Sequence, residues 1–110
     1  MEGDGTAGTA EVLAHLPAGS TPDGVALDAE GGLWVAANLA GQIWRVDTAT
    51  GDAAPFADGL DTPASLAFGA GDDWDPCSIY FTELYGDGVD RLAVGVEGLP
   101  VPVAVAPPDF

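Results

Sequence analysis

The sequence contains no lysine and only two arginines, against 18 acidic residues, so its formal net charge at pH 7 is −16. A protein that binds nucleic acid needs lysine and arginine to contact phosphate groups, and the same cations attract a protein to an anionic membrane. The composition therefore argues against both partners. A surface rich in solvated carboxylates keeps a protein dispersed, including at high salt, and we expect most of the acidic residues to serve this purpose.

Cysteine and histidine are equally scarce. Cys77 and His15 are the only residues of their types, which excludes an internal disulfide, and no local motif supports a Cys/His nucleophile pair. We expect both residues to be structural. The chain also lacks a phosphate-binding glycine loop, an HExxH zinc motif and a GxSxG nucleophile motif. No catalytic residue can be assigned from such motifs.

Long apolar runs are missing as well. No run approaches the ~20 residues that a membrane-spanning helix requires. The N-terminal stretch MEGDGTAGTA has neither the basic nor the apolar region of a signal peptide. These features favour a cytoplasmic location.

Instead of helical patterns, the chain has short apolar runs separated by Gly, Pro, Asp or Asn, which is typical of an all-β protein. Glycine (16) and proline (9) are frequent, and hydrophobic residues make up 47% of the chain, as in a globular domain. The predicted strands are 11–16, 24–28, 33–37, 42–47, 53–57, 64–68, 78–83, 88–93 and 101–105.

The predicted strands repeat. PDGVAL at 22–27 matches PASLAF at 63–68, 41 positions later, and LWV at 33–35 matches IYF at 79–81, 46 positions later. The two arginines, Arg45 and Arg91, also stand 46 positions apart. A unit of about 40–45 residues with four short antiparallel strands is the signature of a β-propeller blade.

The repeat divides the chain into about two blades. The expected organisation is a disordered segment 1–9, an outer strand of a preceding blade within 10–21, blades at 22–60 and 61–106, and a tail at 107–110. Propellers close with four to eight blades, so two blades form an incomplete ring. The remaining blades come from a longer protein, of which this chain is a fragment, or from self-association. We expect Trp34 and Trp44 to pack between blades.

The amino-acid sequence of the repeat is similar to that of a known family. PDGVALDAEGGLWVA (22–36), RVD (45–47), PASLAFG (63–69) and YFT (80–82) resemble the SMP-30/gluconolactonase family of calcium-binding, six-bladed propellers, over residues 10–100. The position of the Pro-Asp-Gly motif corresponds to the C-terminal portion of a family member. NHL-repeat propellers share parts of this pattern, and Ala64 stands where the family often has threonine.

The resemblance implies that Asp23 is one ligand of a divalent metal, Ca²⁺, at the mouth of the central channel. Pro22 fixes its own φ and Gly24 allows a sharp turn, while the hard carboxylate oxygen suits Ca²⁺ or Mg²⁺. Asp-Gly is also ordinary turn chemistry, in which the aspartate bonds its own backbone. The family's other ligands, a glutamate and asparagines from other blades, would lie upstream of Met1, and Asn38 is not assigned as a ligand.

The resemblance further implies that the parent protein is a metal-dependent hydrolase of sugar lactones or similar cyclic esters, with a small-molecule substrate, and that this chain alone is inactive. The alternative is a non-catalytic, NHL-like propeller that binds a ligand or a protein as a scaffold. The acidic loop with Asp72, Asp73 and Asp75 lacks the ligand spacing of a calcium loop, and we expect it to be a solvated loop.

Overall fold

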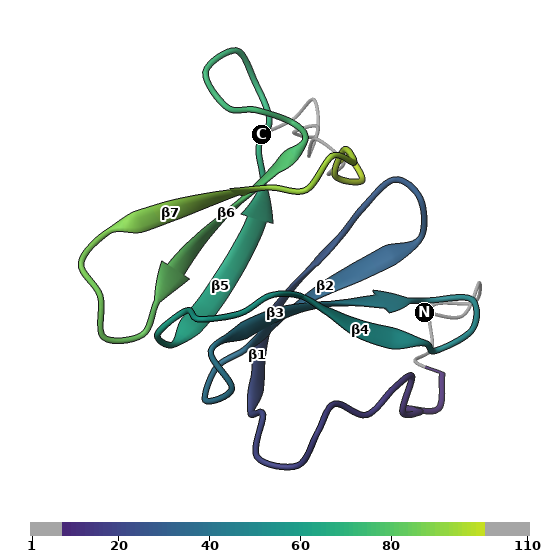
Figure 1. The fold of residues 1–110 in the computed structure, drawn as a ribbon. Coiled ribbons are helices and arrows are strands. Elements are labelled where there is room, and N and C mark those ends of the chain that lie inside the picture. The colour runs from purple at the N-terminus through teal and green to yellow at the C-terminus, as the bar shows by residue number, and fades with distance from the viewer. Residues whose placement is uncertain (1–7, 101–110) are drawn as a thin grey trace, which may run out of the picture.

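The computed structural model describes residues 8–100, which form strands and turns (Figure 1). None of these residues belongs to a helix capable of crossing a membrane. The all-β prediction is confirmed. The strands are β1 (Pro22–Leu27), β2 (Gly32–Ala37), β3 (Gln42–Asp47), β4 (Ala53–Ala57), β5 (Pro63–Phe68), β6 (Ser78–Glu83) and β7 (Val89–Ala93).

The strands form two antiparallel sheets that do not close into a ring. The first has the order β1-β2-β3-β4 and the second has the order β5-β6-β7. The first sheet is the four-stranded blade predicted within 22–60, and the second is the start of the blade predicted from residue 61. Residues 101–105, predicted to form its fourth strand, lie outside the described residues, as do 1–7 and 107–110.

Local turn chemistry sets the hairpins of the first sheet. Between β3 and β4, the Asp47 carboxylate accepts a hydrogen bond from the Ala49 N–H at 2.8 Å, and the Gly51 N–H donates to the Asp47 carbonyl at 2.7 Å. Gly51 has a φ of 81°, which glycine adopts without the steric cost that a Cβ would add. The chain therefore reverses in a few residues, and β4 pairs with β3.

The main core lies between the two sheets. Trp34 and Ile43 of the first sheet form one buried cluster with Ile79 and Phe81 of the second. The Trp34 side chain is 1% exposed, and its ring lies edge-on to that of Phe68 with the centroids 6.4 Å apart. Trp34 thus packs between the blades, as predicted.

The second half of that prediction, for Trp44, concerns the other face of the first sheet. It pairs with Val35 across β2 and β3, and neighbouring residues along a strand point to opposite faces, so Trp44 lies on the face away from the Trp34 core. Its side chain is half-buried, and the indole N–H donates to Gln42 Oε1 at 2.8 Å. No second blade covers this face within the described residues, so the packing of Trp44 between blades stays a prediction.

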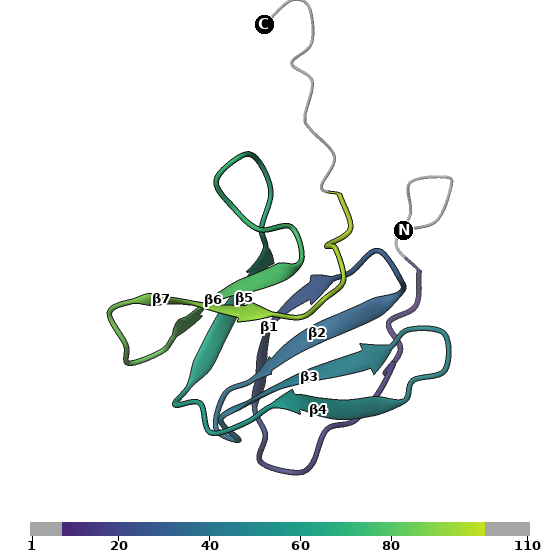
Figure 2. The same ribbon diagram turned by 45° about the horizontal axis from the view of Figure 1, so that its top comes forward.

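The first strands of the two sheets lie side by side (Figure 2). Both contain a bulge near their start, between Pro22 and Val25 in β1 and between Pro63 and Leu66 in β5. A Cβ on Gly24 would clash with the carbonyl oxygen of Ala64. The absence of a side chain at Gly24 therefore lets the two inner strands approach.

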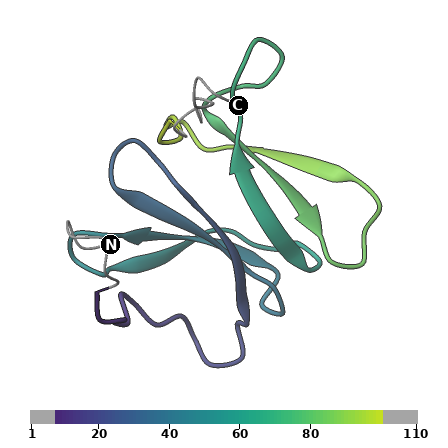
Figure 3. The same ribbon diagram turned by 180° about the vertical axis from the view of Figure 1, so that it is seen from behind.

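The structure assigns no strand to the segment 11–16, which was predicted to be an outer strand of a preceding blade. Since no preceding blade lies among the described residues, that prediction is not tested. An outer strand needs the third strand of its own sheet as a hydrogen-bonding partner. The described residues before Pro22 supply none. Residues 8–21 instead follow an irregular path on the side of the first sheet that faces away from the second (Figures 1 and 3).

The close approach of the inner strands predicts the effect of Gly24→Ala. The added methyl group meets backbone atoms that cannot rotate away, so the two sheets must separate. We expect a loss of about 1–3 kcal/mol in the free energy of unfolding, measured by urea denaturation. Gly88→Ala is the matched control, because nothing lies within 4 Å of its added Cβ. Equal stability of the two variants would contradict the role given to Gly24.

Candidate functional site

Asp23 is the second residue of β1 and lies inside the bulge at the start of this inner strand. Its side chain is exposed. A bulge bends its strand and re-aims the side chains of the residues that do not pair, and bulges are common beside functional sites. The structure therefore leaves the Asp23 carboxylate accessible at one end of the inner strand.

The residues around the start of β1 hold it tightly. Thr21 has a φ of 50°, which is unusual for a β-branched residue and indicates local strain. Its hydroxyl accepts a hydrogen bond from the Leu39 N–H at 2.9 Å, and its carbonyl accepts one from the Asn38 N–H at 3.0 Å. These bonds tie the entry of β1 to the β2–β3 turn.

Asn38 links the two sheets at the same end. Its side chain is buried, and its amide nitrogen donates to the Pro63 carbonyl at 3.0 Å, just where β5 begins. The amide group is therefore engaged in holding β5 beside β1.

The described residues do not form a complete metal site. They contain no group of three or more His, Cys, Asp or Glu side chains that could hold a metal ion. Calcium takes 6–8 oxygen ligands, so Asp23 could supply only a small part of such a site. The loop with Asp72 and Asp73 is exposed, as expected.

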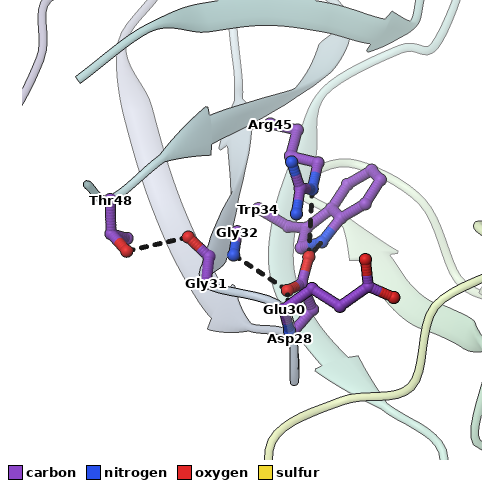
Figure 4. A network of polar contacts seen from close by, with 7 residues as sticks. All are labelled: Asp28, Glu30, Gly31, Gly32, Trp34, Arg45 and Thr48. Atoms are coloured by element: carbon purple, nitrogen blue, oxygen red, sulfur yellow. Dashed lines mark hydrogen bonds and ion pairs between the residues drawn. The ribbon is translucent and has the colours of Figure 1, made fainter. Parts of the chain in front are cut away.

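A second aspartate, Asp28, forms the most connected polar network of the first sheet (Figure 4). Its side chain is fully buried. Oδ1 accepts hydrogen bonds from the backbone N–H groups of Glu30 and Gly32, both at 2.8 Å. Oδ2 accepts one from Trp34 Nε1 at 2.8 Å and one from Arg45 Nε at 3.0 Å. Asp28 therefore joins the β1–β2 turn to β2 and β3.

This network changes the protonation of Asp28. Burial opposes the charged form and raises the pKa, but the hydrogen bonds from the Gly32 N–H, Arg45, the Trp34 indole and the Glu30 N–H outweigh it. The pKa of the Asp28 carboxyl is therefore lower than its ordinary value of 3.8. The carboxylate is charged near neutral pH, and its oxygens are used within the fold.

The second sheet has a related network around Asp75. Its carboxylate accepts hydrogen bonds from the Ser78 hydroxyl at 2.7 Å and the Cys77 N–H at 3.1 Å. These two bonds, together with the charge of Arg91, lower the pKa of the Asp75 carboxyl. The Asp75 N–H donates to the Tyr80 hydroxyl at 2.9 Å.

The two networks occupy equivalent places in the repeat. Ser78, Tyr80 and Arg91 stand 46 positions after Gly32, Trp34 and Arg45. Sequence analysis treated Asp28 as part of a motif and Asp75 as part of a solvated loop, and it missed both networks. The equivalent positions of the only two arginines could have indicated these networks. Each arginine interacts with an aspartate that lies shortly before the second strand of its sheet.

These observations separate the carboxylates into two kinds. Asp28 is satisfied by four donors and anchors the fold, whereas Asp23 is exposed at the opposite end of β1. The family model for the SMP-30/gluconolactonase/LRE-like region matches residues 1–82. The chain belongs to this family.

The family match extends across the first sheet and through most of β6 of the second. It agrees with the resemblance noted from the sequence and with the open arrangement of two antiparallel sheets. No match was found among the curated proteins that were searched. The assignment of this SMP-30/gluconolactonase-like chain therefore rests on the family model and agrees with its two repeated sheets.

The Asp28 network predicts a pH-dependent contribution to stability. Because folding lowers the pKa of Asp28, its contribution is present above the ordinary value of 3.8 and is lost as the pH falls below that value. Asp28→Asn removes the charge and weakens the bonds to buried donors. We expect a loss of about 1–3 kcal/mol at pH 7, and a smaller difference from the wild type at pH 3.

Urea denaturation at both pH values measures this effect. Glu30→Gln is the control, because it removes an exposed carboxylate from the same turn and leaves the backbone N–H that bonds Asp28. A difference between wild type and Asp28→Asn that stays constant from pH 7 to pH 3 would show that the charge of Asp28 does not stabilise the fold.

Proposed function

We propose that this SMP-30/gluconolactonase-like propeller acts, once its ring is complete, as a divalent-metal-dependent hydrolase of sugar lactones or similar cyclic esters. Asp23 supplies one ligand to the metal, with Ca²⁺ the ion that best suits a site of hard oxygen ligands. The observation that supports this proposal is the exposed carboxylate in the bulge of an inner strand, in a chain that belongs to this family.

The arrangement around Asp23 suits a ligand that must be held in place. Pro22 has a fixed φ, and the hydrogen bonds of Thr21 and Asn38 restrain the backbone on either side of the strand entry. A rigid backbone reduces the conformational freedom that a ligand side chain loses on binding. These contacts support the proposal, because the backbone that carries Asp23 is restrained before any ion arrives.

Other carboxylates favour cations at this end of the sheets. Glu83 pairs with Pro63 at the start of β5, and its Oε1 accepts a hydrogen bond from the Asp61 N–H at 3.4 Å. With Asp23, these residues place several negative charges at the end where the inner strands begin, and such a field raises the local concentration of cations. The remaining ligands come from other blades.

A metal bound there would polarise the carbonyl of a cyclic ester and lower the pKa of a bound water. Asp23 would hold the ion, and the restrained backbone around it would keep the carboxylate in register with ligands from the other blades. The described residues alone do not fit a metal, so we expect activity only from the completed ring.

Replacement of Asp23 tests the proposal. In the complete ring, Asp23→Asn should reduce hydrolysis of glucono-1,5-lactone by at least 100-fold and abolish the rise in melting temperature on addition of Ca²⁺, since a metal that binds only the folded state stabilises it. Asp58→Asn is the control, because it removes an exposed carboxylate from the β4–β5 connection. The rate of hydrolysis is measured from the protons that the reaction releases, and the stability is measured by thermal unfolding.

Two results would decide against the proposal. If Asp23→Asn keeps both the activity and the response to Ca²⁺, Asp23 is a turn residue and not a ligand. If the completed ring binds no Ca²⁺ and hydrolyses no lactone, the non-catalytic scaffold, which binds a ligand or a protein, becomes the better interpretation.

A further inference from the structure

Each sheet has two apolar faces, and the internal repeat relates them. On the first sheet the face that contains Trp34 is called the front face, and the face that contains Val35 is called the back face. The front-face residues are Ala26, Trp34, Ala36, Ile43 and the charged Arg45, and the back-face residues are Val25, Leu27, Leu33, Val35, Trp44 and Val46.

The equivalent residues of the second sheet follow from the separations of 41 and 46 positions. Its front face has Ala67, Tyr80, Thr82, Val89 and the charged Arg91, and its back face has Leu66, Phe68, Ile79, Phe81, Leu92 and the charged Asp90. Both faces of both sheets are therefore largely apolar, so each sheet needs a neighbour on each side.

The contact between the two sheets joins unlike faces. Trp34 and Ile43, on the front face of the first sheet, are buried together with Ile79 and Phe81 on the back face of the second. Leu66, Phe68 and Leu92 of the same back face pack against this cluster. The chain thus contains one complete front-to-back interface.

The two outermost faces are the unused halves of the same kind of interface. On the open front face of the second sheet, Val89 is 65% exposed, whereas its counterpart Ile43 is 0% exposed. A hollow of about 460 Å³ lies on this sheet, with Trp74, Tyr80 and Val89 among its lining residues. On the open back face of the first sheet, Val25 is 55% exposed, although its counterpart Leu66 packs into the core.

We propose that the front face of the second sheet binds the back face of the first sheet in another copy of this chain. The interface uses the positions equivalent to those of the one already present within the chain, with Tyr80 and Val89 in the places of Trp34 and Ile43, so the occupant is a second copy in the same relative orientation. Such a head-to-tail contact is heterologous, and it forms a ring if the rotation closes. Two, three or four copies of a two-blade unit would reach the four to eight blades at which propellers close.

The N-terminal segment must move for this contact to form. Val35 and Val46 on the back face are already buried, and residues 8–21 lie on that side of the sheet (Figure 3). Among the described residues, the backbone hydrogen bonds from this segment to the sheet and its turns are those of Ser20 and Thr21 to the β2–β3 turn. The part before Ser20 therefore lies on the sheet through side-chain packing, and another copy must replace that packing in order to displace it.

Charge opposes the association and provides a control. Each copy has a formal net charge of −16, so copies repel one another at low ionic strength. Salt shortens the range of this repulsion, from about 10 Å at 0.1 M to about 3 Å at 1 M, and leaves the apolar contact in place. Association should therefore strengthen as salt is added.

Sedimentation of the purified chain at 0.1 M and 2 M KCl tests the proposal. We expect a closed oligomer at 2 M KCl. Val89→Asp, on the front face, and Val25→Asp, on the back face, should each prevent its formation. Leu39→Asp should not, because Leu39 is 68% exposed in the β2–β3 turn and belongs to neither face. All three residues are more than half exposed, so the variants should fold, as circular dichroism can verify.

A mixture of the two variants makes the test specific. Val25→Asp keeps an intact front face and Val89→Asp keeps an intact back face, so the mixture should form a 1:1 complex and stop there. A monomer at both salt concentrations would overturn the proposal, and the covering blades would then belong to a longer protein. An oligomer that survives Val89→Asp, or a mixture that stays monomeric, would also overturn it.

Discussion

The packing of the two sheets and the Asp28 network both depend on the burial of Trp34 between the sheets. An indole is large, and its polar N–H needs a partner when it is buried, so it suits only a place where an apolar face and a hydrogen-bond acceptor meet. The second sheet supplies the apolar face through Ile79 and Phe81, and Asp28 supplies the acceptor. The indole N–H of Trp34 thereby holds the β1–β2 turn of its own sheet through Asp28, while the rest of the ring packs against the second sheet.

The same pairing of packing and polar anchoring recurs in the second sheet, with weaker partners. Tyr80 replaces Trp34, and its hydroxyl accepts a hydrogen bond from the Asp75 backbone. Asp75 lies in an exposed loop, whereas Asp28 is buried, so the second network is more open to solvent. The difference has a simple cause, because Trp34 is covered by a neighbouring sheet and Tyr80 is covered by none among the described residues.

The strands of the first sheet and the burial of Trp34 could be predicted from the sequence, because short apolar runs between turn residues and an internal repeat are local signals. An outer strand at 11–16 was also predicted, but its pairing depends on a preceding blade that the described residues do not supply. The Asp28–Arg45 pair joins residues 17 positions apart, and only the register of β1 through β3 brings them together. The position of Asp23 on an inner strand was accessible to sequence reasoning, whereas its place inside a bulge was not.

The contact between Gly24 and Ala64 also limits the symmetry of the repeat. Ala64 occupies the position equivalent to Asp23, and it is buried where the inner strands meet. An aspartate there would have to bury its charge beside the Gly24 backbone, which is costly for an unpaired carboxylate. The two blades are therefore similar in their cores but unlike at their inner ends, and exposed carboxylates would alternate with small side chains around any ring built from this pair.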